Sequence, residues 1–333
     1  MPIDNPRLRK YIFYSVLLIA SVIIAILMGE LFLAKISPQP LYTFEKGIFI
    51  NVEDCGYTLA PNITSLQVQP EYRYHIKTNS YGFRGREPQF NADFRVLVLG
   101  DSFGMGQGVE GEETFSSVSQ SYFDSQQSGV DIFNASVSGY SIVNELGVLT
   151  RWIGEYKPNV VALFVNEYDL GERKSIVVQE GYLVEEAGEE LPFKFRTWLN
   201  RHSRIYCLVK RVYYTKNKSW MTAGEHEKLE EEDILYTAQE IGKMNQICRD
   251  RGTSFIVIFS PSMWLHPAMK LLEQKLRNDL VYVLDWASLI PKDRTGELFY
   301  VLDGHLNAKG NRYVSDYFTA LVQAEMAKIH ATR

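Results

Sequence analysis

From Phe94 onward, short apolar segments rich in β-branched residues alternate with longer segments whose apolar residues recur at helical spacing. This alternation is typical of βαβ units built around a parallel sheet. It predicts strands at residues 95–99, 131–135, 160–165, 254–259 and 281–284. Helices are expected at residues 114–126, 142–156, 232–251 and 268–277, and from 308 to about 329. The predicted fold class is therefore α/β, a three-layer α/β/α domain with a five-stranded parallel sheet.

A long uncharged apolar segment, Tyr11 to Gly29, lies near the N-terminus. At about 1.5 Å per residue in a helix, its length approaches the roughly 30 Å thickness of the hydrocarbon core of a membrane. Arg7, Arg9 and Lys10 precede it closely, whereas the next cation after it is Lys35. Because cations favour the cytoplasmic side, we expect a single-pass membrane protein with a cytoplasmic N-terminus and the rest of the chain on the periplasmic or extracellular side.

Two other interpretations of this segment are less favoured. A cleaved signal peptide has a shorter apolar region as a rule, and no A-x-A cleavage site follows here. A buried helix of a soluble core is normally apolar on one face, whereas this segment is apolar around its whole circumference. We therefore expect an uncleaved anchor.

The expected domain organisation follows from these patterns. We expect residues 1–10 to form a cytoplasmic N-terminus, 11–34 a transmembrane anchor, 35–93 a linker with short strands and turns, and 94–330 the α/β domain. An inserted cap at about 171–224 interrupts the alternation and is rich in aromatic and basic residues. Such an insert can line a substrate groove or lie on a lipid surface, but packing against the parent domain is the commoner role.

Composition excludes several classes of function. The chain has 333 residues, 46% of them hydrophobic, so it can form one large folded domain. Its net charge of −5 and the absence of a basic block argue against nucleic-acid binding. The three cysteines, Cys55, Cys207 and Cys248, are too few for a zinc cluster or a disulfide framework, although one bridge stays open. No metal is expected, because four of the six histidines have no partners at ligand spacing, and no cofactor is expected either; the four are His75, His202, His226 and His330.

Two short motifs at opposite ends of the α/β region carry the chemistry. Gly100-Asp101-Ser102 directly follows the apolar segment 95–99, and Asp303-Gly304-His305 lies near the C-terminus. A serine hydroxyl becomes a good nucleophile only when a base takes its proton, and an aspartate can orient that base. The sequence therefore predicts Ser102 as nucleophile, His305 as general base and Asp303 as the orienting carboxylate. Taken singly, each motif is often only a turn or a helix cap.

The first motif, extended through Gly108, resembles the first block of the SGNH (GDSL) hydrolase family. The segment from Asp303 to Gly310 is similar to the D-x-H form found in a membrane-associated branch linked to acetyl chemistry on extracellular polysaccharides. The segment from Thr78 to Gly85 also resembles one that precedes the G-D-S strand in that branch. The resemblance covers about residues 71 to 325, and it implies an SGNH-type fold and a serine esterase that acts through an acyl-enzyme.

The resemblance also implies donors for the oxyanion. Residues Asn134 to Ser141 match the second block of the family, in which a glycine donates its backbone N–H; here that is Gly139, acting beside the N–H of Ser102. The third block departs from the family pattern G-x-N-D, because this chain has Asn166 three residues before Asp169. If Asp169 aligns with the aspartate of the family pattern, Tyr168 occupies the position of its asparagine. If the loop is shifted relative to that pattern, Asn166 can reach the oxyanion as a donor. Asn166 can also serve only as a cap of the following turn. A missing donor typically costs about 10² to 10³ in rate.

The resulting hypothesis is an esterase that removes O-acetyl groups from a cell-envelope or exported polysaccharide. Its expected partners are the acylated glycan, the membrane through one helix, and the envelope polysaccharide machinery. Three alternatives remain: an O-acetyltransferase on such a glycan, a lipid esterase, and a non-catalytic scaffold with the same fold. His266 follows the fourth strand and could enter the cleft, but a lone histidine before proline is more often a turn residue.

Overall fold

The structure is a computed structural model, and it describes residues 6–36, 41, 47–69, 71–171, 176–179, 181–185, 195, 198–216, 231–262 and 267–331. The chain divides into two compact units. We call the first the anchor unit; it comprises Met1–Phe44, Val68–Pro70 and Glu189–Lys218. The second, the sheet unit, comprises Glu45–Gln67, Glu71–Gly188 and Ser219–Arg333.

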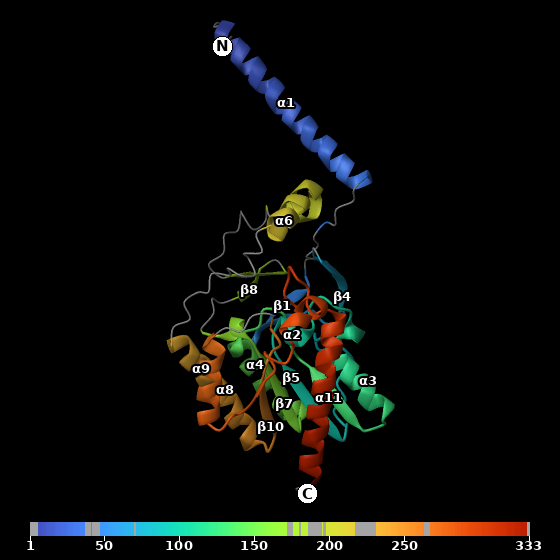
Figure 1. Cartoon of the computed structure of the whole chain (residues 1–333), viewed down its shortest axis with the longest axis vertical. Coiled ribbons are helices and arrows are strands. Elements are labelled where there is room, and N and C mark those ends of the chain that lie inside the picture. The colour runs from blue at the N-terminus through green and yellow to red at the C-terminus, as the bar shows by residue number, and fades with distance from the viewer. Residues whose placement is uncertain are drawn as a thin grey trace. The chain divides into compact units, whose positions relative to one another are not determined.

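The sheet unit is built on five parallel strands (Figure 1). They confirm the predicted α/β fold, and their bounds agree with the predicted ones to within one residue. In space the order is β11-β10-β7-β5-β6. The strands are β5 (Phe94–Leu99), β6 (Val130–Asn134), β7 (Val160–Val165), β10 (Ser254–Phe259) and β11 (Tyr282–Asp285).

The strand order determines where a ligand can approach the sheet. The chain passes from β5 to β6 on one side of β5, and then to β7 on the other side. Connections that leave in opposite directions open a crevice at the carboxyl ends of the two strands between which the order reverses, here β5 and β7. Ser102 lies three residues after the end of β5, at this crevice.

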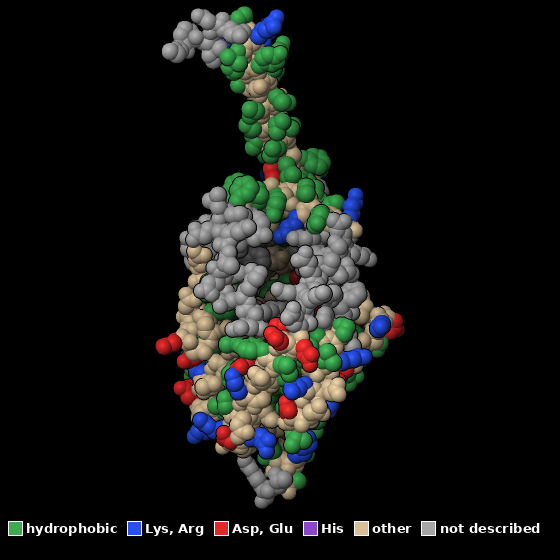
Figure 2. All heavy atoms as spheres, turned by 90° about the vertical axis from the view of Figure 1, so that its left-hand side faces the viewer, with side chains coloured by type: hydrophobic (Ala, Val, Ile, Leu, Met, Phe, Trp, Pro, Cys, Tyr) green, Lys and Arg blue, Asp and Glu red, His purple; other side chains and the backbone are tan. Residues whose placement is uncertain are grey.

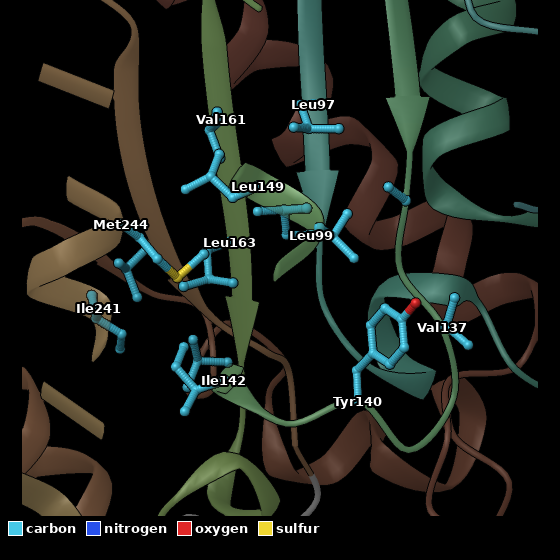
Figure 3. Close-up of a cluster of buried hydrophobic side chains, with 14 of the residues drawn as sticks. Leu97, Leu99, Val137, Tyr140, Ile142, Leu149, Val161, Leu163, Ile241 and Met244 are labelled. Atoms are coloured by element: carbon cyan, nitrogen blue, oxygen red, sulfur yellow. The ribbon is translucent and has the colours of Figure 1, made fainter. Parts of the chain in front are cut away.

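Helices cover both faces of the sheet, as expected from strands whose successive side chains point to opposite sides. On one face Leu97 and Leu163 pack in a buried cluster with side chains of α4, α8 and α9, part of which Figure 3 shows. On the other face Val96 and Ala162 pack with side chains of α3 and α11. These helices are α3 (Phe115–Ser125), α4 (Ile142–Tyr156), α8 (Glu231–Asp250), α9 (Pro267–Asn278) and α11 (Ala308–Ala331).

Shorter elements surround this core. The region predicted to hold short strands and turns contains two two-stranded sheets. One is the antiparallel pair of β1 (Phe49–Val52) and β2 (Gly56–Leu59), and the other pairs β3 (Thr64–Val68) with β4 (Arg73–Lys77). Within the predicted insert, the hairpin β8 (Ile176–Gln179) and β9 (Tyr182–Glu185) belongs to the sheet unit, whereas α6 (Arg204–Lys216) belongs to the anchor unit. The remaining short helices are α2 (Ser102–Met105), α10 (Thr295–Leu298), η1 (Gly111–Glu113), η2 (Glu167–Asp169) and η3 (Lys292–Arg294).

The anchor unit contains α1 (Pro6–Lys35), a helix of 30 residues. It is the one helix among the described residues that is long and apolar enough to cross a membrane, with a mean hydropathy of 2.7 in its most apolar window. Only 6% of that window is buried, which argues against a core helix of a soluble protein. Figure 2 shows the hydrophobic side chains along it. An uncleaved anchor and a signal peptide both fit these features.

The three cysteines lie in buried positions. Cys55 and Cys248 belong to the sheet unit, and Cys207 lies on α6. None of them forms a disulfide within the part of the chain that the structure describes. Burial raises the pKa of the Cys248 thiol to about 12, so this thiol keeps its proton at neutral pH.

Candidate active site

The turn after β5 presents Ser102 at the start of α2. Asp101 caps this short helix, because its Oδ1 accepts the backbone N–H of Phe103 at 2.9 Å. The other oxygen, Oδ2, accepts the side-chain amide of Asn166 at 2.8 Å. Both oxygens of the buried Asp101 carboxylate are thus engaged, and the turn that carries Ser102 is held from two sides.

A second turn brings Asp303 and His305 to the same edge. The Tyr300 N–H donates to the His305 carbonyl at 2.8 Å, which closes the turn. From the other side, the Glu71 carboxylate accepts the N–H groups of Leu302 at 2.6 Å and Asp303 at 2.8 Å. The backbone around Asp303 is therefore fixed by a residue that lies more than two hundred positions earlier in the chain.

These two turns bring together the three residues predicted to act in catalysis. Ser102 Oγ lies 2.8 Å from His305 Nε2, although the residues are 203 positions apart in sequence. The opposite ring nitrogen, Nδ1, is hydrogen-bonded to Asp303 Oδ1. The side chains of His305 and Asp303 are only 15% and 18% exposed. The ring of Phe103 packs on the imidazole with centroids 4.7 Å apart, which restricts its rotation.

The charge balance of the site suits a general base. Burial by itself lowers the pKa of His305, but the Asp303 carboxylate outweighs this effect, and the pKa stands above its ordinary value. A carboxylate at Nδ1 also favours the tautomer that carries its proton there, which leaves the Nε2 lone pair facing the hydroxyl of Ser102. The arrangement can therefore take a proton from Ser102 and hold it as an imidazolium.

A chain of hydrogen bonds behind Asp303 was not predicted from the sequence. The Tyr72 hydroxyl donates to Asp303 Oδ2 at 3.0 Å and accepts from Gln107 Nε2 at 3.2 Å. The Gln107 Oε1 in turn accepts from Ser138 Oγ at 2.7 Å. Burial, followed by the charge of Asp303, raises the pKa of Tyr72, so its hydroxyl remains a donor. These hydrogen bonds connect the carboxylate of Asp303 with Ser138, the residue next to Gly139.

The backbone donors proposed for the oxyanion are Ser102 and Gly139. Gly139 has φ of +82°, a left-handed conformation that favours glycine, and it follows β6 in the loop before α4. Within the described part of the chain, neither N–H donates to another protein atom, and both residues are partly exposed. Unpaired donors at an open edge are what a developing oxyanion requires. Their catalytic role remains a proposal.

Residues 166–169, which follow β7, contact the turn that carries Ser102. Asn166 follows β7 and is buried; its side-chain amide donates to Asp101, and its backbone N–H donates to Asp169 Oδ2 at 2.7 Å. The side chain of Tyr168 and the whole of His266 lie outside the described residues. Which of Asn166 and Tyr168 completes the oxyanion site therefore stays open.

Arg84, in the segment that precedes the G-D-S strand, supports the loop after Ser102. Its buried guanidinium donates to the carbonyls of Met105 at 3.2 Å, Gly106 at 2.7 Å and Val109 at 2.7 Å. These carbonyls lie at the end of α2 and in the loop that leads to η1. A planar group with several fixed donors can hold such a loop in one conformation, which a lysine cannot do in the same way.

Comparisons with known proteins find matches among solved structures. Scans against protein-family models and curated proteins found no match. Among solved structures, the chain is similar to an acetyl xylan esterase, AlAXEase, with 12% identity over 69% of this chain and 100% of that one, at a TM-score of 0.45. It is also similar to the psychrotrophic esterase EstA from Pseudoalteromonas sp., with 15% identity over 71% and 96% and a TM-score of 0.40. A third is a G-D-S-L family lipolytic protein from Veillonella parvula, with 12% identity over 68% and 96% and a TM-score of 0.39. At these low values we base the function of the chain on its own side-chain geometry.

Proposed function

We propose that this chain is a serine esterase that acts through an acyl-enzyme. The observation that carries the proposal is the 2.8 Å contact between Ser102 Oγ and His305 Nε2, with Asp303 on the other ring nitrogen. In the first step Ser102 Oγ attacks the ester carbonyl while its proton passes to Nε2. The imidazolium that forms is stabilised by the Asp303 carboxylate.

The remaining steps use the same groups. The negative charge on the carbonyl oxygen faces the N–H groups of Ser102 and Gly139, which stabilise it. When the tetrahedral intermediate collapses, the ester C–O bond breaks and the leaving alcohol takes the proton from Nε2. Water then attacks the acyl-enzyme, with His305 again as base, and releases the carboxylic acid and a free Ser102.

The substrate class that we propose is an O-acetyl group on a cell-envelope or exported polysaccharide. Two segments support it by their resemblance to the polysaccharide-linked branch of the family: Asp303 to Gly310, and Thr78 to Gly85. The apolar helix α1 also supports it, because an anchor with the cations Arg7, Arg9 and Lys10 at its cytoplasmic end puts the catalytic domain on the side where such glycans lie.

Labelling with a fluorophosphonate probe tests the nucleophile. We expect covalent labelling of the wild-type chain and none of Ser102→Ala, because only an activated serine reacts with the probe. Ser121→Ala is the matched control, since Ser121 is an exposed serine on α3 that bonds only within its own helix. Equal labelling of wild type and Ser102→Ala would exclude Ser102 as the activated nucleophile.

Acetate release from a panel of acetylated sugars and polysaccharides tests the reaction. An esterase releases acetate with or without an added acceptor glycan. An O-acetyltransferase uses the same residues but transfers the acetyl group, so acetate falls and acetylated acceptor accumulates when the acceptor is added. Labelling of Ser102 with no turnover of any acetyl ester would point to another acyl group, such as that of a lipid.

A further inference from the structure

Within the anchor unit, a carboxylate of α1 caps the N-terminus of α6. Glu30 Oε1 accepts the Ser203 hydroxyl at 2.6 Å and the Ile205 N–H at 3.2 Å, and Oε2 accepts the Arg204 N–H at 2.8 Å. The first backbone N–H groups of a helix have no partner inside it, and the helix dipole attracts a negative charge there. One side chain of α1 therefore satisfies the start of α6.

The two helices also approach each other closely at this point. A Cβ atom on Gly29 would lie 2.9 Å from Cδ1 of Ile205, so the absence of a side chain next to Glu30 lets Ile205 pack against α1. The packing and the cap together fix the start of α6 to one position along α1.

This position corresponds to the outer headgroup region if α1 spans a membrane. A helix of 30 residues is about 45 Å long at 1.5 Å per residue, which matches the roughly 40–45 Å of a bilayer with its headgroups. Glu30 lies immediately after the uncharged segment Tyr11 to Gly29 and about one turn before α1 ends at Lys35. A carboxylate is costly in hydrocarbon but not among headgroups.

The exposed side chains of α6 form an apolar stripe that begins at this point. Val209, Val212 and Tyr213 are 60%, 44% and 57% exposed. They follow Ile205 at positions i+4, i+7 and i+8, so all four lie on one face of the helix. In the helical residues just before α6, Trp198 is also 54% exposed. Hydrophobic side chains gather beside the lower end of α1 in Figure 2.

The charge of α6 indicates which partner covers this stripe. The helix carries Arg204, Lys210, Arg211 and Lys216 and no carboxylate. A second copy of α6 would bring the same cations against them, whereas anionic lipids in the membrane surface attract them. An apolar face combined with a purely cationic polar side is typical of helices that lie in the membrane surface.

We propose that α6 lies along the outer surface of the membrane that α1 spans, with the Val209, Val212 and Tyr213 face among the lipid headgroups. The proposal rests on the anchor that forms part of the proposed function. It gives the aromatic and basic insert a lipid-binding role and makes Glu30 the residue that positions α6 at the correct depth. In such helices the apolar face is buried about 5–10 Å into the boundary between headgroups and acyl chains.

Fluorescence quenching in vesicles tests this placement. The full chain is reconstituted in vesicles of phosphatidylcholine and phosphatidylglycerol whose acyl chains carry a nitroxide near the headgroup. An environment-sensitive fluorophore is attached to one introduced cysteine, in Val212→Cys, Arg211→Cys or Ala20→Cys. The unmodified chain, whose three cysteines are buried, gives the background. Arg211 is the matched control, because it is exposed on the same helix about 100° away from Val212 and opposite the stripe.

We expect strong quenching and a blue-shifted emission at position 212, and weak quenching at position 211. Equal quenching at 211 and 212 would overturn the proposal. The fluorophore at position 20, in the middle of α1, tests separately whether α1 is inserted in the membrane. For this position the vesicles carry the nitroxide deeper in the acyl chain, and quenching there shows that α1 is inserted, whatever the placement of α6. No quenching at position 20 would overturn the anchor and the proposal together.

Dilution of the protein in the vesicles identifies the occupant of the stripe. A lipid contact at position 212 is independent of the protein-to-lipid ratio. A blue shift at 212 that disappears on dilution would show a second copy of the chain on the stripe, and would overturn the assignment to lipid.

Discussion

Replacement of Tyr72 by phenylalanine tests how the carboxylate of the proposed catalytic group is held. The change removes one hydroxyl, which donates to Asp303 Oδ2 at 3.0 Å, and leaves the ring in place against Tyr300. A hydrogen bond to a charged group contributes roughly 1.5–3 kcal/mol. Without this donor Asp303 is less constrained, and its negative charge is shared with one partner fewer.

Two effects on activity follow from this loss. We expect kcat/KM at its plateau to fall by about tenfold, which corresponds to about 1.4 kcal/mol of lost positioning. With one hydrogen bond fewer, the negative charge of Asp303 also stabilises the imidazolium of His305 more strongly, so the pKa of His305 rises further. Because His305 acts as a base only when neutral, the acid limb of the pH profile moves to higher pH by up to about one unit, or about 1.36 kcal/mol.

The assay is kcat/KM for a chromogenic acetyl ester, measured from about pH 5 to pH 9. Tyr300→Phe is the matched control: it removes a neighbouring phenol hydroxyl, which donates to the Gly108 carbonyl at 2.9 Å and not to Asp303. This control should keep the wild-type acid limb. The reasoning is refuted if Tyr72→Phe keeps the wild-type acid limb, or if Tyr300→Phe moves it by the same amount.

Three further changes have defined outcomes. Asp303→Asn should lower kcat by about 10⁴-fold. It should also move the acid limb of the pH profile to lower pH, because the carboxylate that raises the pKa of His305 is lost. An acid limb at the wild-type pH would argue against this cause. Arg84→Met should lower the free energy of unfolding by about 3 kcal/mol in urea titration, because buried carbonyls lose their donor; a loss close to zero would contradict the clamp. Burial, together with the charges of Asp169 and Asp101, raises the pKa of Glu145 well above 4.5, so the folded chain keeps this proton. The protein therefore loses stability as the pH rises from the pKa of Glu145 in the unfolded chain to its pKa in the folded chain. Glu145→Gln should therefore show a flatter dependence of Tm on pH over that window, and an unchanged slope would show that Glu145 is ionised in the fold.

The strands and helices of the sheet unit could be predicted because their signals are local. Residues 160–165 form an uninterrupted apolar segment whose six positions are all buried, as expected for a central parallel strand covered on both faces. The helix predicted at 142–156 is found within those bounds, because its apolar residues recur at helical spacing and Ser141 with Asn144 forms a capping box. Such patterns depend on near neighbours in the sequence.

The supports of the proposed catalytic group could not be predicted in the same way. Glu71 and Tyr72 contact the turn around Asp303 across 231 or more positions of sequence. Neither residue type is diagnostic, since a glutamate or tyrosine after a proline-rich segment is ordinary at a surface. Arg84 lay within a segment that resembled the family, but its clamp on Met105 and Gly106 depends on how two loops meet. Only the folded chain shows these contacts.

Strand register brings the loops that follow β6 and β7 to the turn that carries Ser102. Between β5 and β6, Val98 pairs with Asn134, and just past the strand ends the Val137 N–H donates to the Gly100 carbonyl at 3.1 Å. Between β5 and β7, Leu99 pairs with Leu163, and just past the strand ends the Asn166 side-chain amide donates to Asp101 Oδ2 at 2.8 Å. Because parallel strands end at the same edge, the loop that holds Gly139 and the loop that begins with Asn166 both lie at the edge of the sheet where Ser102 lies. The departure of residues 166–169 from the pattern G-x-N-D therefore does not move Asn166 away from this edge; instead its amide is directed onto Asp101, where it holds the turn that presents Ser102.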